Sequence, residues 1–272
     1  MANIRIENFG GRIPRMSSRL LPGNHGQQAA DTKLFSGELR GWNEPRLIVE
    51  LTGTVNTAYR IPDPGGDIWF TSQYSNVHVQ KGTLVNDTFE RYYWTSGTDD
   101  VARYNTKARI DSGSPDYILG APAPSAAAAI GVTGGTGPTV TRVFVYTFVS
   151  QYGEESAPSA AVTGTGNSDG TWTLSSMKTD TDTPITGRSN FTNANGAVKR
   201  IYRTITATSG QTNFFFVKEV TMATTSTDVS ATDETVAYND LMESTGWNEP
   251  PDDLEGLITH PNGFLVGFVG SD

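Results

Sequence analysis

The residues that break helices constrain the fold of this chain most. Of its 272 residues, 29 are glycine, 14 are proline and 36 are threonine. Glycine and proline destabilise helices, and threonine is β-branched and favours strands. No apolar stripe with helical spacing continues for more than about two turns. Short apolar runs separated by turn signals recur instead, so the sequence predicts an all-β protein.

Residues 46–120 predict a β-meander domain. Tyr92, Tyr93 and Trp94 are consecutive, so bulky rings lie on both faces of one strand. Such a strand is typically covered on both sides, although a platform for stacking carbohydrate is the alternative. The expected strands of this domain are RLIVELTG, TAYRI, DIWFTSQ, VHVQKG, TFERYYWTSG, ARYNT and DYILG.

Residues 121–245 predict a second domain. It begins with a linker of proline and alanine over residues 121–130, APAPSAAAAI. A clean alternation follows, and TWTLSSM, VKRIYRTI and TNFFFVKEV supply further strands, with a long surface loop over 178–197. This pattern favours an immunoglobulin-like sandwich, and the absence of cysteine favours its fibronectin III-like version. The alternation places Val143, Val145, Thr147 and Val149 on one face and Phe144, Tyr146 and Phe148 on the other.

The two ends of the chain differ from these domains. Residues 1–45 have no sustained apolar period and predict an extended docking arm, with one or two helical turns over 27–34. Residues 246–272 predict a return linker and a terminal strand, in which Phe264, Val266 and Phe268 alternate. No partner follows that strand. It therefore pairs with residues 46–120, pairs with another subunit, or begins a domain absent from this sequence. In the first case, residues 257–269 would complete the β-meander domain.

The pentapeptide GWNEP occurs twice, at residues 41–45 and 246–250. The segments that follow the two copies differ, so the repeat does not indicate duplicated domains. For the two tryptophans, Trp42 and Trp247, we expect burial at the junction of the domains.

Charge is distributed unevenly along the chain. The net charge of −9 argues against a general nucleic-acid binder. Residues 1–20 contain four arginines and one acid, whereas residues 219–272 contain eleven acids and no lysine or arginine. The asymmetry is either chance or the sign of a basic arm that lies on an acidic surface of a neighbouring copy. No apolar run approaches 18 residues, so we expect no membrane span.

The sequence shows no catalytic constellation, and we expect no enzyme activity, cofactor or metal. Without cysteine, disulfides, a thiol nucleophile and a cysteine zinc site are excluded. Adjacent acids in extended chain point to opposite faces, so Glu154-Glu155 and Asp252-Asp253 are expected in solvated turns rather than as acid–base couples. The remaining candidates lack ligand spacing: His25, His78 and His260, and a calcium set of Asp180, Asp182, Asp228 and Asp233.

Several motifs of this chain resemble the motifs of one protein family. The arm GRIPRMSSRLLPGNHGQQAADTKLFSGELRGW, residues 11–42, is similar to the N-terminal signature of that family. YILGAPAP (117–124) resembles its hinge before a fibronectin-like insert, and YTFVSQYGEESAPS (146–159) and RIYRT (200–204) resemble sandwich strands. Residues 247–251 and 260–268 resemble its step into the next β unit. The family that these motifs resemble is that of virion structural proteins from tailed bacteriophages.

The resemblance implies a structural component of the tail nozzle, tail tube or collar. Copies would form a ring in the virion, after assembly in the host cytoplasm, beside portal, adaptor or other tail proteins and around passing DNA that they do not bind specifically. Several members are longer, so this chain is a truncated form or a shorter relative. The alternative is a phage-borne or secreted module that binds carbohydrate through Trp69, Trp94 and Trp172, and a polysaccharide hydrolase is a more remote one. Candidate contacts between subunits are Arg12, Arg15, Arg19, Leu20, Leu21, Trp42, Phe264, Val266 and Phe268.

Overall fold

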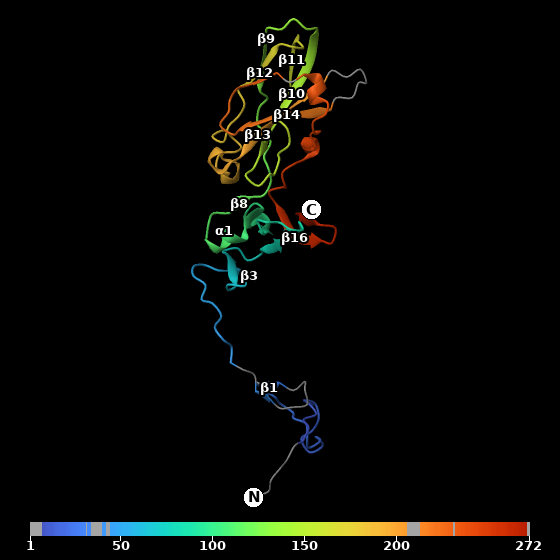
Figure 1. The fold of residues 1–272 in the computed structure, drawn as a ribbon. Coiled ribbons are helices and arrows are strands. Elements are labelled where there is room, and N and C mark those ends of the chain that lie inside the picture. Colours follow the sequence, from blue (N-terminus) through green and yellow to red (C-terminus); the bar gives the residue numbers. More distant parts are fainter. Residues whose placement is uncertain are drawn as a thin grey trace. The chain divides into compact units, whose positions relative to one another are not determined.

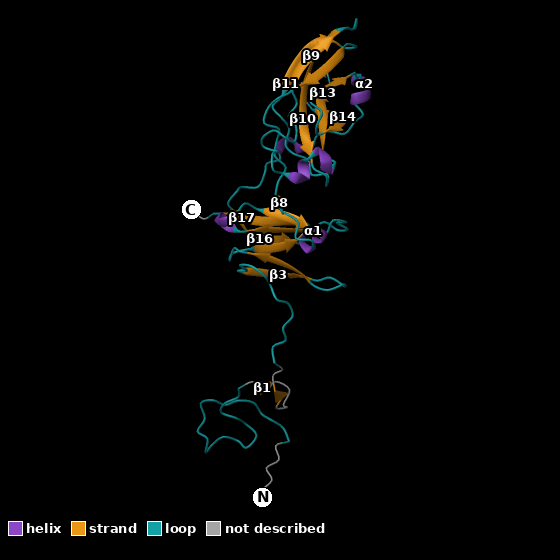
Figure 2. Cartoon of the chain, turned by 90° about the vertical axis from the view of Figure 1, so that its left-hand side faces the viewer, coloured by secondary structure: helices purple, strands orange, loops and turns teal. Residues whose placement is uncertain are grey.

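Strands dominate the chain in the computed structural model (Figures 1 and 2). The structure describes residues 7–30, 32–33, 40–41, 44–205, 213–230 and 232–270. Within these ranges the α-helices are α1 (Lys107–Asp111) and α2 (Asp233–Val236), each of only one turn. The predicted all-β class is therefore confirmed. The chain divides into two compact units, Met1–Thr52 and Gly53–Asp272.

The first unit has no buried residue among those that the structure describes. It contains the short strands β1 (Thr32–Lys33) and β2 (Arg40–Gly41), which pair with each other. The predicted arm is not extended along its whole length. Backbone hydrogen bonds from Gly10 to Asn24 and from Ile13 to Gly26 close residues 10–26 into a loop. The helical turns expected over 27–34 are absent from residues 27–30, and β1 follows them.

The second unit begins with the predicted meander. Its strands surround Ile61, Phe70 and Trp94. Tyr92 and Trp94 lie on the same face of their strand and are buried in this core, whereas Tyr93 on the opposite face is only partly covered. The strand expected over 46–53 is absent, because residues 44–52 bond to no neighbouring strand. The observed strands are β3 (Thr57–Ile61), β4 (Ile68–Ser72), β5 (His78–Lys81), β6 (Arg91–Thr95), β7 (Arg103–Thr106) and β8 (Tyr117–Ile118), with a 3₁₀-helix, η1 (Gly97–Asp99), before β7. They form two antiparallel sheets, β3-β4 and β5-β6-β7-β8.

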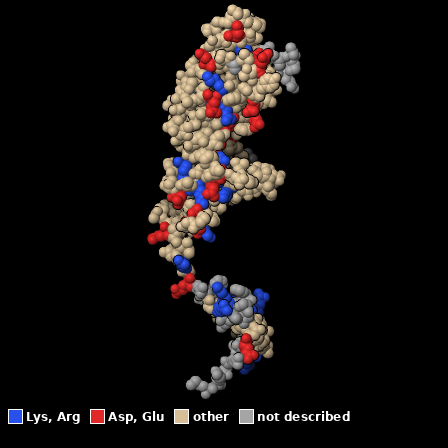
Figure 3. Space-filling view, in the orientation of Figure 1, with Lys and Arg blue, Asp and Glu red and all other residues tan. Residues whose placement is uncertain are grey.

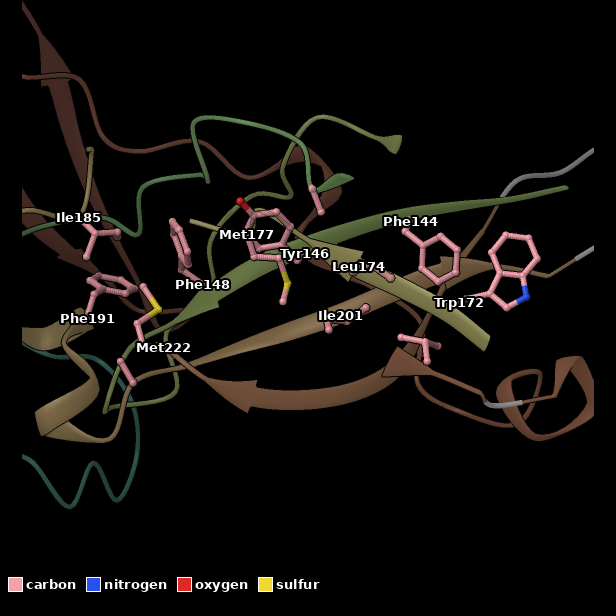
Figure 4. Close-up of a cluster of buried hydrophobic side chains, with 13 residues drawn as sticks. Phe144, Tyr146, Phe148, Trp172, Leu174, Met177, Ile185, Phe191, Ile201 and Met222 are labelled. Atoms are coloured by element: carbon pink, nitrogen blue, oxygen red, sulfur yellow. The ribbon is translucent and has the colours of Figure 1, made fainter. Parts of the chain in front are cut away.

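Two further sheets, which we call the sandwich, share one hydrophobic core. The alternation in β10 (Thr139–Val149) is confirmed, because Phe144, Tyr146 and Phe148 all point into this core. Figure 4 shows Phe144 and Trp172 at one end and Phe148, Phe191 and Met222 at the other. One sheet has the order β11-β10-β13-β14 and the other β15-β12-β9. The remaining bounds are β9 (Ala129–Thr133), β11 (Val162–Asn167), β12 (Thr171–Ser175), β13 (Val198–Thr204), β14 (Phe214–Thr221) and β15 (Thr227–Val229).

The strand order does not confirm the immunoglobulin- or fibronectin III-like assignment. In the immunoglobulin constant fold, the first, second, fourth and fifth strands form one sheet. Here the first, fourth and seventh strands of the sandwich form one sheet, and the other four form the second. The stretch 178–197 is also more than a surface loop. It contains the 3₁₀-helices η2 (Ser189–Phe191) and η3 (Asn193–Asn195), and its Ile185 and Phe191 are buried in the core.

The chain continues through η4 (Ser244–Gly246) into a terminal β-hairpin of β16 (Leu254–His260) and β17 (Phe264–Val269). The terminal strand therefore has a partner, and that partner precedes it in the sequence. Leu257 of β16 is buried, and β16 lies against β5, β6 and η1. Thr83 fixes the turn by donating its hydroxyl hydrogen to the Gly263 carbonyl at 2.6 Å. The hairpin thus packs on the meander without adding a strand to its sheets.

Candidate inter-subunit surfaces

The terminal hairpin presents an apolar face to solvent. Phe264, Val266 and Phe268 lie on the same side of β17, as their alternation predicts, and Ile258 of β16 stands opposite Val266. Phe264 is 49% exposed and Phe268 is 57% exposed. Figure 3 shows the hairpin as a protrusion that carries no charged atoms on the side in view. Exposed apolar patches of this kind typically mark a surface that contacts another molecule.

Local sequence explains this geometry. Gly263 takes a φ of 87° in the turn, where its missing side chain allows the left-handed backbone. Gly256 leaves the space over which the ring of Phe268 lies. His260 stacks on Phe264 with ring centroids 4.3 Å apart, so this histidine belongs to the apolar face. Among the described residues no strand pairs with the outer edge of β17, so its backbone groups can accept a further strand.

The N-terminal unit presents the basic side chains that the sequence singled out. Arg12, Arg15 and Arg19 are all exposed. The structure shows no ion pair between any of them and another residue within its described ranges. Leu20 is 75% exposed, and Leu21 is partly covered. Figure 3 shows basic side chains prominent on this unit. Trp42 lies outside the described residues.

The sequence analysis missed a groove beside the outer edge of β14. The segment after α2 bonds to this edge: the Phe216 amide donates to the Asp240 carbonyl at 2.8 Å, and the Met242 amide donates to the Phe214 carbonyl at 2.9 Å. A hollow of about 380 Å³ lies beside it, with Leu241 and Trp247 among its lining residues. Their side chains are 51% and 50% exposed. Trp247 is therefore not buried, contrary to expectation. Trp247 follows the turn residues of η4 and lies outside any strand, and this position was the signal that its side chain would be exposed.

The adjacent acids Glu154 and Glu155 are not in solvated turns. They do point in opposite directions, as extended chain requires. Glu154 accepts hydrogen bonds from Tyr104 at 2.6 Å and from Arg91 at 3.2 Å, both in the meander. Burial, the charge of Glu154 and its hydrogen bond raise the pKa of Tyr104. Glu154 thus connects the turn between β10 and β11 to strands β6 and β7.

Glu155 acts within the sandwich instead. It accepts from Tyr202 at 2.6 Å and from Thr147 at 2.7 Å, and it pairs with Arg200 at 2.8 Å. Burial and the hydrogen bond to Glu155 raise the pKa of Tyr202. Both carboxylates are therefore occupied by structural partners, and no geometry for acid–base catalysis arises from them.

The other candidate residues are dispersed. Trp94 and Trp172 are buried, so neither ring offers a face to a sugar, and Trp69 is partly covered. His25, His78 and His260 lie in the N-terminal loop, on β5 and in the hairpin, and Asp252 and Asp253 lie just before the hairpin.

The four aspartates of the calcium hypothesis have separate partners. Asp233 accepts from Arg142 and Arg203 at 2.7 Å each, and Asp228 accepts from Thr173 at 2.6 Å. Asp182 accepts from Thr179 at 2.8 Å, and Asp180 accepts from the Asn193 amide at 2.8 Å. The described part of the chain contains no group of three or more histidine, aspartate or glutamate residues arranged to hold a metal ion. It also contains no helix long and apolar enough to cross a membrane.

Comparison with known proteins finds no protein-family model that matches the chain and no matching curated protein. Its function must therefore be argued from the apolar hairpin, the exposed arginines of the N-terminal loop and the groove at the edge of β14.

Proposed function

We propose that this chain is a structural subunit of a bacteriophage virion. Its copies form a cyclic ring in the tail or head-to-tail region, as part of a nozzle, tube or collar near the DNA passage. Its partners are other copies of itself and the neighbouring tail, adaptor or portal proteins. DNA passes such a ring without sequence-specific binding, and the role requires no cofactor and no enzymatic activity.

The observation that carries this proposal is the exposed apolar face of the terminal hairpin. Ile258, Phe264, Val266 and Phe268 would expose their side chains to water in an isolated subunit. Burying them against another subunit stabilises an assembly by about 25 cal/mol for each Å² of apolar area removed from water. The free edge of β17 adds backbone hydrogen bonds to the same contact. A hairpin that meets a different surface on the next copy gives a head-to-tail contact, which closes into a ring when the rotation permits.

The resemblance of residues 11–42 and 117–124 to virion proteins supports the same role. The net charge of −9 is compatible with a wall near passing DNA, because a basic wall would hold phosphates through counterion release.

The test is whether the full chain assembles and whether the hairpin is required. Native mass spectrometry and imaging of intact particles should show a ring on the tail axis. Phe264→Ser combined with Phe268→Ser should abolish the ring while lowering the thermal unfolding midpoint only modestly, since about half of each side chain is exposed. A control with Val85→Ser and Tyr238→Ser, which also removes two exposed apolar side chains, should assemble normally. A monomer absent from particles would contradict the proposal.

A further inference from the structure

The groove at the edge of β14 combines apolar and acidic surface. Leu241 and Trp247 supply half-exposed apolar side chains, and Glu219, Asp240 and Glu243 supply carboxylates. Arg200 also lines the groove, but Glu155 holds it at 2.8 Å and Glu219 holds it at 3.3 Å. The local charge is therefore negative.

Two of these carboxylates have no cationic partner in the part of the chain that the structure describes. Asp240 and Glu243 are exposed, and neither forms an ion pair with any residue that the structure describes. Asp240 directly precedes Leu241 in the sequence, and Glu243 lines the same hollow as Trp247. The groove thus fits a segment in which an exposed cation and an exposed apolar side chain are neighbours.

The N-terminal loop of this chain contains such a segment. Arg19 is followed directly by Leu20, and both side chains are exposed. Arg12 and Arg15 add two more exposed cations nearby in sequence. In the described residues of the segment 7–30, Glu7 is the only acid. Charge and apolar character both match the groove.

We infer that the acidic groove beside Trp247 receives the basic loop segment Arg12–Leu21 from a second copy of this chain. This inference rests on the proposed assembly of copies, and it adds a second contact to that of the hairpin. Arg19 pairs with Asp240 or Glu243, and Leu20 covers Leu241 and Trp247. In the proposed ring, each loop enters the groove of the next copy, so the contact is head-to-tail.

Charge reversal tests the contact in the full chain. A loop variant carries Arg12→Glu, Arg15→Glu and Arg19→Glu, and a groove variant carries Asp240→Lys and Glu243→Lys. Each variant alone should require roughly tenfold more protein for half-assembly at low salt. An equimolar mixture of the two should recover to within roughly threefold of the parent, because each loop meets a groove of opposite charge wherever the two variants alternate. The loss should shrink as salt is added.

The matched control reverses exposed acids elsewhere. The control variant carries Asp111→Lys, Glu234→Lys and Asp252→Lys, which together change the net charge by more than the groove variant does. None of these three acids forms an ion pair with a residue that the structure describes. This control should assemble like the parent. Equal loss in control and groove variant would show a general charge effect and overturn the inference. Failure of the mixture to recover would also overturn it.

The absence of native cysteine allows a direct check of which copy supplies the loop. Ser18→Cys with Thr245→Cys should give disulfide-linked multimers on oxidation. Ser18→Cys with Thr163→Cys, on β11 at the opposite edge of the same sheet, should give few. A cross-link confined to monomers would show that each groove holds its own loop, and this would overturn the assignment to a second copy. If the parent chain assembles while these tests fail, only this inference is lost; if the parent does not assemble, the proposed function is lost with it.

Discussion

Lys199 lies in the interior of the sandwich, where a charged group is unfavourable. Its strand β13 turns Lys199, Ile201 and Arg203 toward the same side, and Lys199 has no exposed surface. Its ammonium donates to the Thr224 carbonyl at 2.6 Å. Burial lowers the pKa of Lys199 from 10.5 to about 8, since desolvation penalises the charged form more than the distant charges of Asp182 and Asp180 favour it.

The lowered pKa predicts a stability that rises with pH. Between pH 8 and pH 10.5 the unfolded chain holds the lysine proton and the folded chain releases it, so alkali favours the folded state. Relative to Lys199→Met, the parent should gain about 3 kcal/mol of unfolding free energy across this range. Denaturant unfolding of both proteins at several pH values measures the difference. A difference that does not change with pH would show that the lysine stays charged in the folded chain.

Gly166 allows the two sheets to approach closely at one edge of the sandwich. A methyl group added there would lie 2.5 Å from a methyl carbon of Val132 on the facing sheet. Gly166→Ala should therefore destabilise the fold by about 1–3 kcal/mol, because the core must shift to admit the methyl group. Gly131→Ala is the control, since nothing lies within 4 Å of the added atom. Equal unfolding midpoints for the two variants would exclude this crowding.

At the scale of elements, the turn between β10 and β11 joins the sandwich to the meander. Glu154 in this turn accepts from Tyr104 and Arg91, and Asn190 of η2 donates to the same Tyr104 hydroxyl at 3.0 Å. Glu154→Ala should lower the free energy of unfolding by about 1–3 kcal/mol, because it leaves the buried Tyr104 hydroxyl and the mostly buried Arg91 guanidinium with fewer hydrogen-bond partners.

Glu154→Gln provides the graded comparison. It keeps a hydrogen-bond acceptor but removes the charge, so it should lower the free energy of unfolding less than Glu154→Ala does. Hydrogen exchange should accelerate first in β6 and β7, which Glu154 contacts. Unchanged protection of these strands would show that the turn does not restrain the meander.

The alternation of apolar side chains was the most informative sequence signal for the strands and for the faces that they bury. It placed Phe144, Tyr146 and Phe148 in the core because one strand face meets the facing sheet along its whole length. It failed for residues 46–53, where an apolar run has no neighbouring strand to bond with. It also missed the roles of Glu154 and Glu155, because their partners lie far away in the sequence. Partners of this kind depend on tertiary contacts that a single strand pattern does not contain.

The candidate surfaces were predictable to different degrees. Phe264, Val266 and Phe268 share a face because a strand has a period of two, which the sequence shows directly. The pairing of β17 with β16 was missed, although Pro261-Asn262-Gly263 between apolar runs is a hairpin signal. The groove beside Trp247 was not predictable, since it forms where the chain after α2 returns to the edge of β14.

At the scale of the whole molecule, the division into two units predicts that folding and assembly can be separated. The described residues of 7–52 contribute no buried side chain, whereas residues 53–272 contain every core cluster. Deleting residues 1–40 should therefore leave the thermal unfolding midpoint nearly unchanged. The deletion should nevertheless prevent assembly at the protein concentration that half-assembles the parent, because it removes Arg12, Arg15, Arg19 and Leu20. Calorimetry and native mass spectrometry on one preparation measure both properties. If the shortened chain assembles at normal stoichiometry, the hairpin contact alone holds the ring. If its unfolding midpoint is lowered, the N-terminal unit stabilises the fold itself.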